Sequence, residues 1–306
     1  MAGSSALNAF EWRSAAWQQH LNRVVFGGRC IQYLDIGQGP VVVLVHGLAS
    51  AWPVWFRNIS ELAAEHRVIA VDLPGFGGSD NFGGRVEIDH YVDALIRLLD
   101  RLEVQRVRMV GHSLGGIIAG QFAAQHPSRT EALVLVATGV SPRRWQVLLL
   151  RGLAASIVLL NRGRLPLFGV AIRAAMASAP LRRLLLRPMV RDPAAVSREL
   201  AVDMMTGAGN SPGATAALKA ALRAIRQQDL RAVVCPTLIV GGACDRMAPA
   251  ASLDHLAGVI VGARKELMAE AGHHPMFERS EEFNALVCGF FEDVRQSHEQ
   301  KRDAVY

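Results

Sequence analysis

A serine inside a short glycine motif is the first residue with catalytic potential. Residues 111–115 read Gly-His-Ser-Leu-Gly and directly follow the apolar run Val107–Val110. A serine on a sharp turn between a strand and a helix holds its hydroxyl in the open, and such a turn needs small residues at Gly111 and Gly115. The pattern therefore predicts that Ser113 is a nucleophile.

A serine hydroxyl needs an imidazole to accept its proton, and the imidazole needs a carboxylate to fix its tautomer. Asp245 lies just past the apolar run Thr237–Val240, and reactive groups of an open parallel sheet gather at the carboxyl ends of the strands. We predict that Asp245 is this carboxylate. The alternative is an Asp that only caps a loop or the helix expected at residues 248–256.

Two adjacent histidines late in the chain could supply the base. His273 follows Gly272, whereas His274 precedes Pro275 and is expected to pack. We predict His273 as the general base, which gives the chain order serine, aspartate, histidine that this kind of site uses.

A developing oxyanion needs two N–H donors. One is expected from Leu114, at the start of the helix after the serine. The other is expected from Leu48, in the loop after the apolar run Val41–Val45. The supporting residues of these motifs are His46, Gly47, Gly111, His112 and Gly115.

The glycine-rich segment at residues 72–80 could be interpreted as a phosphate-binding loop. It reads Asp-Leu-Pro-Gly-Phe-Gly-Gly-Ser-Asp and lacks both the Lys-Ser/Thr ending of a P-loop and the G-x-G-x-x-G spacing of a dinucleotide site. We expect a structural loop near the site.

The elements that position these residues follow from the pattern of apolar runs. Short apolar runs typical of buried strands alternate with amphipathic helical segments, which predicts a parallel sheet covered by helices. The runs are 41–45, 68–71, 107–110, 133–136 and 237–240, the helical segments include 54–65, 88–102 and 116–125, and a hairpin is expected at 23–36. Residues 1–140 and 232–306 are predicted to form this core domain.

The alternation stops in the predicted insert, residues 141–231, which contain Leu-, Ala- and Arg-rich helical segments. This insert holds 14 Arg and one Lys against four acidic residues, whereas the whole chain of 306 residues has a net charge of +6. The basic character therefore belongs to the insert, and the rest of the chain is acidic.

Together these motifs resemble the α/β-hydrolase superfamily, in particular its capped esterase, perhydrolase and carbon–carbon hydrolase branch. The matching segments are His46-Gly47, residues 72–79, residues 111–116, Asp245 and residues 272–278. The resemblance implies a mostly parallel eight-stranded sheet with helices on both faces, and a helical cap formed by the insert at 141–231.

The resemblance also implies a reaction class. A serine nucleophile argues against epoxide hydrolases and haloalkane dehalogenases, which need an aspartate, and the His before Ser113 is commoner in esterases than in carbon–carbon hydrolases. We therefore expect cleavage of a small hydrophobic carboxylic ester through an acyl-enzyme. Carbon–carbon hydrolysis, perhydrolysis and thioester hydrolysis by the same three residues are the alternatives.

No metal or organic cofactor is expected for this chemistry. The four cysteines, Cys30, Cys235, Cys244 and Cys288, show no metal-ligand spacing and suit free thiols in a reducing compartment. The first 19 residues lack a signal-peptide pattern, so a cytoplasmic location is expected.

The positive charge of the insert suggests binding partners other than the substrate. Its arginines include Arg162, Arg164, Arg182, Arg183, Arg187 and Arg191. They could face an anionic membrane surface or an acidic carrier, and solvated helix faces are the alternative. Nucleic acid is not expected, because aromatic residues are not interleaved with the arginines. The insert's leucines, including Leu148–Leu150, Leu159, Leu160, Leu165, Leu167 and Leu184–Leu186 with Phe168 and Met189, are expected to form an apolar ceiling over the site.

Overall fold

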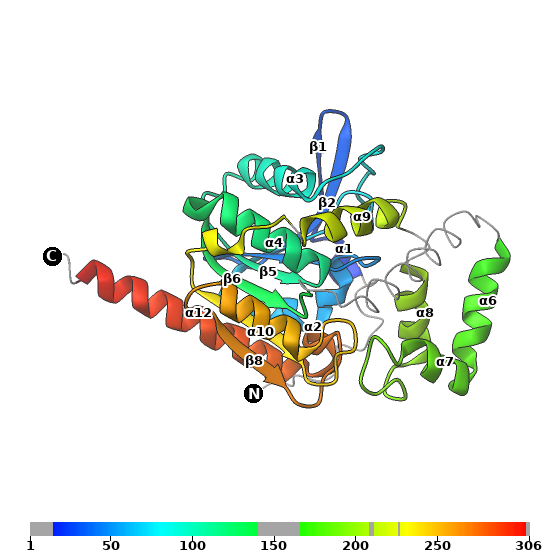
Figure 1. The fold of residues 1–306 in the computed structure, drawn as a ribbon. Coiled ribbons are helices and arrows are strands. Elements are labelled where there is room, and N and C mark those ends of the chain that lie inside the picture. Colours follow the sequence, from blue (N-terminus) through cyan, green and yellow to red (C-terminus); the bar gives the residue numbers. More distant parts are fainter. Residues whose placement is uncertain (1–14, 140–165, 208–210, 226, 304–306) are drawn as a thin grey trace.

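In the part of the chain that the structure describes, the strands form one sheet of eight. Figure 1 shows this sheet with the helices around it. The computed structural model describes residues 15–139, 166–207, 211–225 and 227–303. In these residues the strand order is β1-β2-β4-β3-β5-β6-β7-β8. The strands are β1 (Leu21–Phe26), β2 (Arg29–Ile36), β3 (Val41–Val45), β4 (Arg67–Val71), β5 (Val107–His112), β6 (Thr130–Val136), β7 (Thr237–Gly242) and β8 (Arg264–Met268).

The sheet is mostly parallel. Only the β1–β2 hairpin and the β2–β4 pair are antiparallel, and all pairs from β4 to β8 are parallel. In the register, Val45 of β3 pairs with Gly111 of β5 and with Val71 of β4. Because these strands run in the same direction, the segments that follow them emerge at one edge of the sheet, where the predicted reactive residues lie.

Helices cover both faces of the sheet, as expected. Their bounds are α1 (Ala15–Gln18), η2 (Trp52–Trp55), α2 (Phe56–Leu62), α3 (Ile88–Arg101), α4 (Leu114–Gln125), η3 (Pro127–Arg129), α6 (Pro166–Ala177), α7 (Ala179–Leu186), α8 (Arg198–Gly207), α9 (Ala214–Ala224), η4 (Leu230–Ala232), α10 (Ala250–Val259), α11 (Pro275–Glu278) and α12 (Ser280–Asp303).

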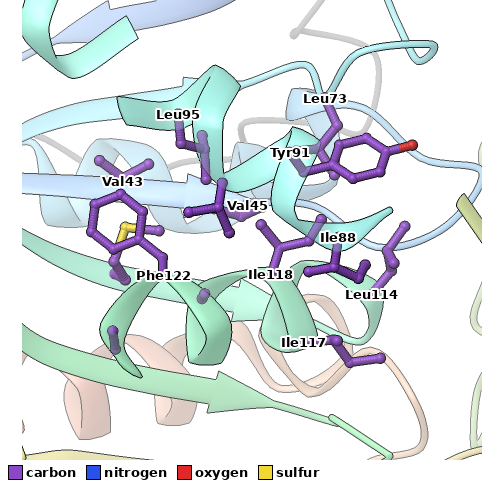
Figure 2. Packing of buried hydrophobic residues seen from close by; sticks show 14 of the residues in the cluster. Val43, Val45, Leu73, Ile88, Tyr91, Leu95, Leu114, Ile117, Ile118 and Phe122 are labelled. Carbon is purple, nitrogen blue, oxygen red and sulfur yellow. The ribbon is translucent and has the colours of Figure 1, made fainter. Parts of the chain in front are cut away.

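Alternate residues of the central strands point to opposite faces, because side chains along a strand alternate. Val43 and Val45 lie in the cluster with α3, α4, α9 and α10, whereas Val42 and Leu44 lie in the cluster with α1, α2 and α12. Figure 2 shows Phe122 and Ile118 of α4 packing toward the first of these pairs. Burial on both faces explains why β3 consists only of Val and Leu.

The predicted strands and helices are confirmed, and the differences lie at their ends. β5 continues through His112, so the strand leads directly into Ser113. β6 begins at Thr130, three residues before the apolar run that predicted it. Polar residues at strand ends carry no apolar signal, which is why the sequence pattern underestimates these lengths.

Helices α6, α7 and α8, here called the α6–α8 unit (residues 166–207), lie beside the sheet domain at the right of Figure 1. They share a small hydrophobic cluster of their own, made of Ile172, Met176, Leu186, Val190, Val196 and Ala201. Helix α9 also falls in the range predicted as an insert, but its buried alanines pack with α3 and α4 in the core of the sheet domain. The division into a core at 1–140 and 232–306 and a cap at 141–231 stays a prediction.

None of the described helices combines the length and the hydropathy needed to cross a bilayer.

Candidate active site

Ser113 occupies the turn between β5 and α4 in a strained backbone conformation. Its φ is 53° and its ψ is −112°, which costs a non-glycine residue about 1–3 kcal/mol. Its N–H donates to the carbonyl of Val136 at 2.8 Å, which anchors the turn to β6. A Cβ on Gly111 would lie 2.3 Å from the carbonyl oxygen of Gly115, and one on Gly115 would lie 2.2 Å from that of Val45. Both glycines are therefore required by close packing.

The structure brings Ser113, His273 and Asp245 together from three distant segments. His273 Nε2 lies 3.2 Å from the Ser113 hydroxyl oxygen, and His273 Nδ1 lies 2.8 Å from Asp245 Oδ2. The carboxylate accepts the Nδ1 proton, so Nε2 keeps a lone pair that faces the serine hydroxyl. This arrangement can transfer a proton from the serine to the imidazole.

Asp245 makes the hydrogen bonds of a loop cap as well as a bond to His273, while the helix α10 begins later, after Pro249. Its Oδ1 accepts the N–H groups of Met247 and Ala248 at 2.7 and 2.9 Å, while its Oδ2 bonds to His273. Its side chain is fully buried. Each lone pair used by a backbone donor restricts the carboxylate further, so the turn cap also fixes the direction of the bond to His273.

His274 is turned away from the serine. Its Nδ1 lies 3.2 Å from the carbonyl oxygen of Met189, which follows α7. Burial, reinforced by the neighbouring His273, lowers the pKa of His274 to about 4. His274 is therefore a neutral donor to the α6–α8 unit, and the contacts agree with the choice of His273 as the base.

His112, the residue before the serine, holds the backbone of the predicted base. Its Nε2 lies 2.8 Å from the carbonyl oxygen of His273 and donates to it. Burial and the neighbouring His274 and His273 place the pKa of His112 well below its ordinary value, so the ring is neutral. Its Nδ1 has no hydrogen-bond partner within the described ranges.

The loop after β3 packs closely against Ser113. A Cβ on Gly47 would lie 2.8 Å from His112 Nδ1 and 3.3 Å from the Cβ of Ser113. His46 fixes this loop, because its Nδ1 lies 2.7 Å from the Gly47 carbonyl oxygen while its Nε2 accepts the N–H of Leu73 at 3.0 Å. Burial lowers the pKa of His46, which keeps this tautomer neutral.

The two predicted oxyanion donors come from different segments: Leu114 directly follows Ser113, and Leu48 follows the Gly47 that packs against Ser113. Leu114 is the first residue of α4, where helix N–H groups have no intrahelical acceptor. Leu48 follows Gly47, and the chain turns directly afterwards at Ala49, whose φ is 57°. The N–H groups of Leu48 and Leu114 remain the predicted donors.

The glycine-rich loop at 72–80 is organised by its own aspartate. Asp72 Oδ1 accepts the N–H of Trp52 at 2.8 Å, and its Oδ2 accepts the N–H of Gly78 at 2.8 Å and the amide of Gln32 at 2.9 Å. The Ser79 hydroxyl donates to the Asp72 carbonyl at 2.6 Å. A buried carboxylate that already holds these donors suits a structural loop and opposes phosphate binding.

Glu278 is a positioning residue to which the sequence pattern assigned no role. Its Oε1 accepts the N–H groups of Gly272 and His274 at 3.0 and 3.1 Å, and its Oε2 accepts the N–H of Arg191 at 2.7 Å. The His273 N–H donates to the Met189 carbonyl at 3.1 Å. The segment after α7 is thus bonded directly to the loop that carries the predicted base.

The expected apolar ceiling is only partly described, and the described part differs from the expectation. Leu184 and Leu185 are exposed, and Leu186 is buried in the cluster of the α6–α8 unit. The expectation was wrong for Leu184 and Leu185 because these two side chains lie on the solvent side of α7, whereas Leu186 packs on its buried side. Leu148–Leu150, Leu159, Leu160, Leu165, Arg162 and Arg164 lie outside the described residues, as do the side chains of Leu167 and Phe168.

Within the described ranges, no group of three His, Cys, Asp or Glu side chains has an arrangement that could hold a metal ion. The four cysteines are free thiols, and only Cys244 is exposed. Burial raises the pKa of Cys235 to about 11, so this thiol stays protonated at neutral pH.

The strand order, the strained turn at Ser113 and the hydrogen-bonded side chains define a hydrolase architecture, and sequence comparison gives the same class. The family model described as the alpha/beta hydrolase fold matches residues 40–280. The chain belongs to the alpha/beta hydrolase fold family, and the fold predicted from its sequence is confirmed.

Relatives within this family act on different bonds. The chain is 32% identical over 282 residues to 2-hydroxy-6-oxo-2,4-heptadienoate hydrolase of Pseudomonas putida, covering 87% of this chain and 94% of that protein. It is 28% identical over 262 residues to the pimeloyl-(acyl-carrier protein) methyl ester esterase of Aeromonas hydrophila, covering 83% and 96%. A solved meta-cleavage product hydrolase of Pseudomonas fluorescens IP01 is 25% identical, with a TM-score of 0.70 over 89% of this chain and 98% of that one.

The buried neutral histidine His274 predicts acid-sensitive stability. Its pKa is about 4 in the folded chain and about 6.5 when unfolded, so between these values the unfolded state binds more protons. The free energy of unfolding should therefore fall as pH drops from 7 to 4, with on the order of 3 kcal/mol from this group. Urea unfolding at several pH values measures the slope.

The His274→Asn variant keeps an N–H donor toward Met189 and should show a shallower slope. The same substitution at the exposed His255 is the matched control and should leave the slope as in the wild type. Equal slopes in all three proteins would contradict this prediction.

Glu278→Gln tests whether the clamp on the histidine loop positions the base. The amide places its NH2 group either against the Arg191 N–H or against the N–H groups of Gly272 and His274, so the clamp between the segment after α7 and the histidine loop loses hydrogen bonds. We expect kcat of ester hydrolysis to fall about tenfold to a hundredfold with a smaller change in KM, since a small displacement of a catalytic group costs about that much. Glu282→Gln, at an exposed acid paired with Arg279, is the control. A change in Tm with an unaltered kcat would show a purely structural role.

Proposed function

We propose that this chain is a serine hydrolase that cleaves carboxylic esters with a hydrophobic acyl or aryl group through an acyl-enzyme. The observation that carries the proposal is the continuous hydrogen-bonded chain from the Ser113 hydroxyl through His273 to Asp245. A serine hydroxyl needs this series of hydrogen-bonded groups to become a nucleophile near neutral pH.

In the first step, Ser113 Oγ attacks the ester carbonyl while His273 Nε2 accepts the hydroxyl proton. The negative charge that develops on the carbonyl oxygen is received by the N–H groups of Leu48 and Leu114, each contributing about 3 kcal/mol in comparable sites. Asp245 stabilises the imidazolium that forms. The tetrahedral intermediate collapses as His273 returns the proton to the leaving alcohol.

In the second step, a water molecule takes the place of the alcohol. His273 accepts its proton as it attacks the acyl-enzyme, and the same donors receive the charge again. Ser113 leaves with its proton restored and the carboxylic acid is released. The reaction needs one proton-transferring side chain, which the geometry supplies.

Carbon–carbon hydrolysis is a second candidate, and two of the relatives support it. The chain is 31% identical over 275 residues to a 2-hydroxymuconate semialdehyde hydrolase of a Pseudomonas species, besides the heptadienoate hydrolase above. Breaking such a bond leaves an enolate in place of an alkoxide, and a positive charge beside it would favour this cleavage. In the described part of the site, His112 and His274 are neutral and bonded to backbone carbonyls, so neither offers a charge for this purpose.

A fluorophosphonate probe and p-nitrophenyl esters test the serine hydrolase proposal. The wild type should be labelled and should hydrolyse these esters, and Ser113→Ala should abolish labelling and lower kcat by about a thousandfold or more. The exposed Ser128→Ala is the matched control. A Ser113→Ala protein that keeps wild-type hydrolysis at equal folded content would refute the proposal.

Substrate preference separates the two candidates. We expect kcat/KM for hydrophobic aryl or alkyl esters to exceed that for a 2-hydroxy-6-oxo-dienoate, whose cleavage is followed by its absorbance. Thioesters of the same acyl groups, and peracid formation from the acyl-enzyme, complete the panel. A dienoate cleaved far faster than any ester would assign the chain to carbon–carbon hydrolysis and leave the role of Ser113 intact.

A further inference from the structure

Helix α7 exposes a stripe of leucines. Leu181, Leu184 and Leu185 expose 46%, 66% and 39% of their surface. They occupy positions i, i+3 and i+4, which lie on one side of a helix. Val170, on the neighbouring helix α6, is 63% exposed. Large apolar side chains are thus concentrated on the surface of the α6–α8 unit.

The same surface is strongly basic. Residues 166–191 contain five arginines and no acidic residue. Arg183 on α7 and Arg187, the residue that caps its C-terminus, are exposed one turn apart and next to the leucine stripe, and Arg173 is exposed on α6. Within the described residues, no carboxylate lies at ion-pair distance from these three side chains. Their charge is therefore available to an anionic partner.

The position of α7 leaves the stripe open to a large partner. Figure 1 shows α6 and α7 at the side of the molecule away from the sheet. The buried side of α7 is accounted for, because Leu186 packs in the cluster of the α6–α8 unit and the Arg182 side chain donates to the Met176 carbonyl at 2.8 Å. The outward side of α7, in contrast, is exposed to solvent.

We propose that the outward face of α7, with Leu181, Leu184, Leu185, Arg183 and Arg187, is a docking surface for an anionic lipid bilayer. A helix that lies in a bilayer interface inserts its leucines below the headgroups, while arginines beside them reach the phosphates. The arginines attract the anionic headgroups, and the leucine stripe inserts below them into the bilayer. An acidic protein would satisfy the arginines but leave three leucines against a polar surface.

The docking surface is connected to the candidate active site. Met189 is the third residue after α7, and its carbonyl accepts the His273 N–H at 3.1 Å. Arg191 N–H donates to Glu278 at 2.7 Å. A bilayer bound to α7 therefore lies along the chain segment that holds the predicted base, although the proposal does not depend on the reaction catalysed there.

Vesicle flotation tests the docking surface with the Ser113→Ala protein, so that no lipid ester can be consumed. Vesicles of phosphatidylcholine alone are compared with vesicles of equal parts phosphatidylcholine and phosphatidylglycerol. We expect binding only to the anionic vesicles. The Arg183→Ser/Arg187→Ser variant and the Leu181→Ser/Leu184→Ser variant should each bind at least about tenfold more weakly, since an arginine near an anionic surface and a buried leucine both contribute strongly.

Two controls match these variants. Arg97→Ser/Arg101→Ser on α3 removes the same charge from exposed positions with the same spacing, and Val261→Ser removes an apolar side chain that is 88% exposed. Both should bind as the parent protein does. All substituted side chains are exposed, and circular dichroism with Tm verifies equal folding.

Other occupants give other results, and each would overturn the proposal. Absence of binding to anionic vesicles at low salt excludes a lipid surface. Loss of binding with the arginine variant alone, with the leucine variant unaffected, indicates an acidic partner. Equal loss in the α3 control indicates unspecific charge attraction. A change from dimer to monomer in the leucine variant, measured by light scattering, identifies the stripe as a contact between copies of this chain.

Discussion

The hydrogen bond between His273 Nδ1 and Asp245 Oδ2 is the interaction on which the candidate site depends. It decides which nitrogen of the imidazole carries the proton, and therefore whether Nε2 can accept one from Ser113. The bond is directional because Asp245 is held by the Met247 and Ala248 N–H groups as well. Its burial excludes water that would compete for the carboxylate. Without this bond, the strained turn at Ser113 would present a hydroxyl with no base.

The sheet provides the constraint that makes this bond reachable. The pairing of Val45 with Gly111 brings the ends of β3 and β5 together, and Ser113 N–H is bonded to the end of β6. Asp245 follows β7, which pairs with β6. Thus the serine and the aspartate follow two parallel strands, β5 and β7, that flank β6 on either side. The backbone strain at Ser113 is offset by the many buried contacts of β5 and α4, whose glycines allow the strand and helix to approach closely.

The amino-acid sequence predicts the sheet and the three candidate site residues because each of these features has a pattern within a short segment. An all-apolar run such as Val41–Val45 can only be a doubly buried strand, and a glycine-flanked serine after such a run has few other structural explanations. The clamp by Glu278 is different. Its partners on the α6–α8 unit lie almost ninety residues away, so no local pattern reveals them. Likewise, the run Leu184–Leu186 shows hydrophobicity but not which side of α7 faces solvent, and the pattern around α9 does not show that it packs with α3 and α4.

The three site residues differ in what holds them, and this difference has a consequence for motion. Ser113 and Asp245 are fixed by strands and backbone donors within the sheet domain. His273 is fixed on one side by His112, whose Nε2 donates to its carbonyl, and on the other side by Met189 of the segment after α7. A displacement of that segment would therefore move the imidazole of His273 relative to Ser113 and Asp245. His112 holds the histidine loop to the sheet domain, whereas His274 joins this loop to the segment after α7. Both rings are neutral and donate to backbone carbonyls, so neither competes for the proton on His273. His273, the predicted base, is thus the member of the candidate site whose placement depends on both the sheet domain and the α6–α8 unit.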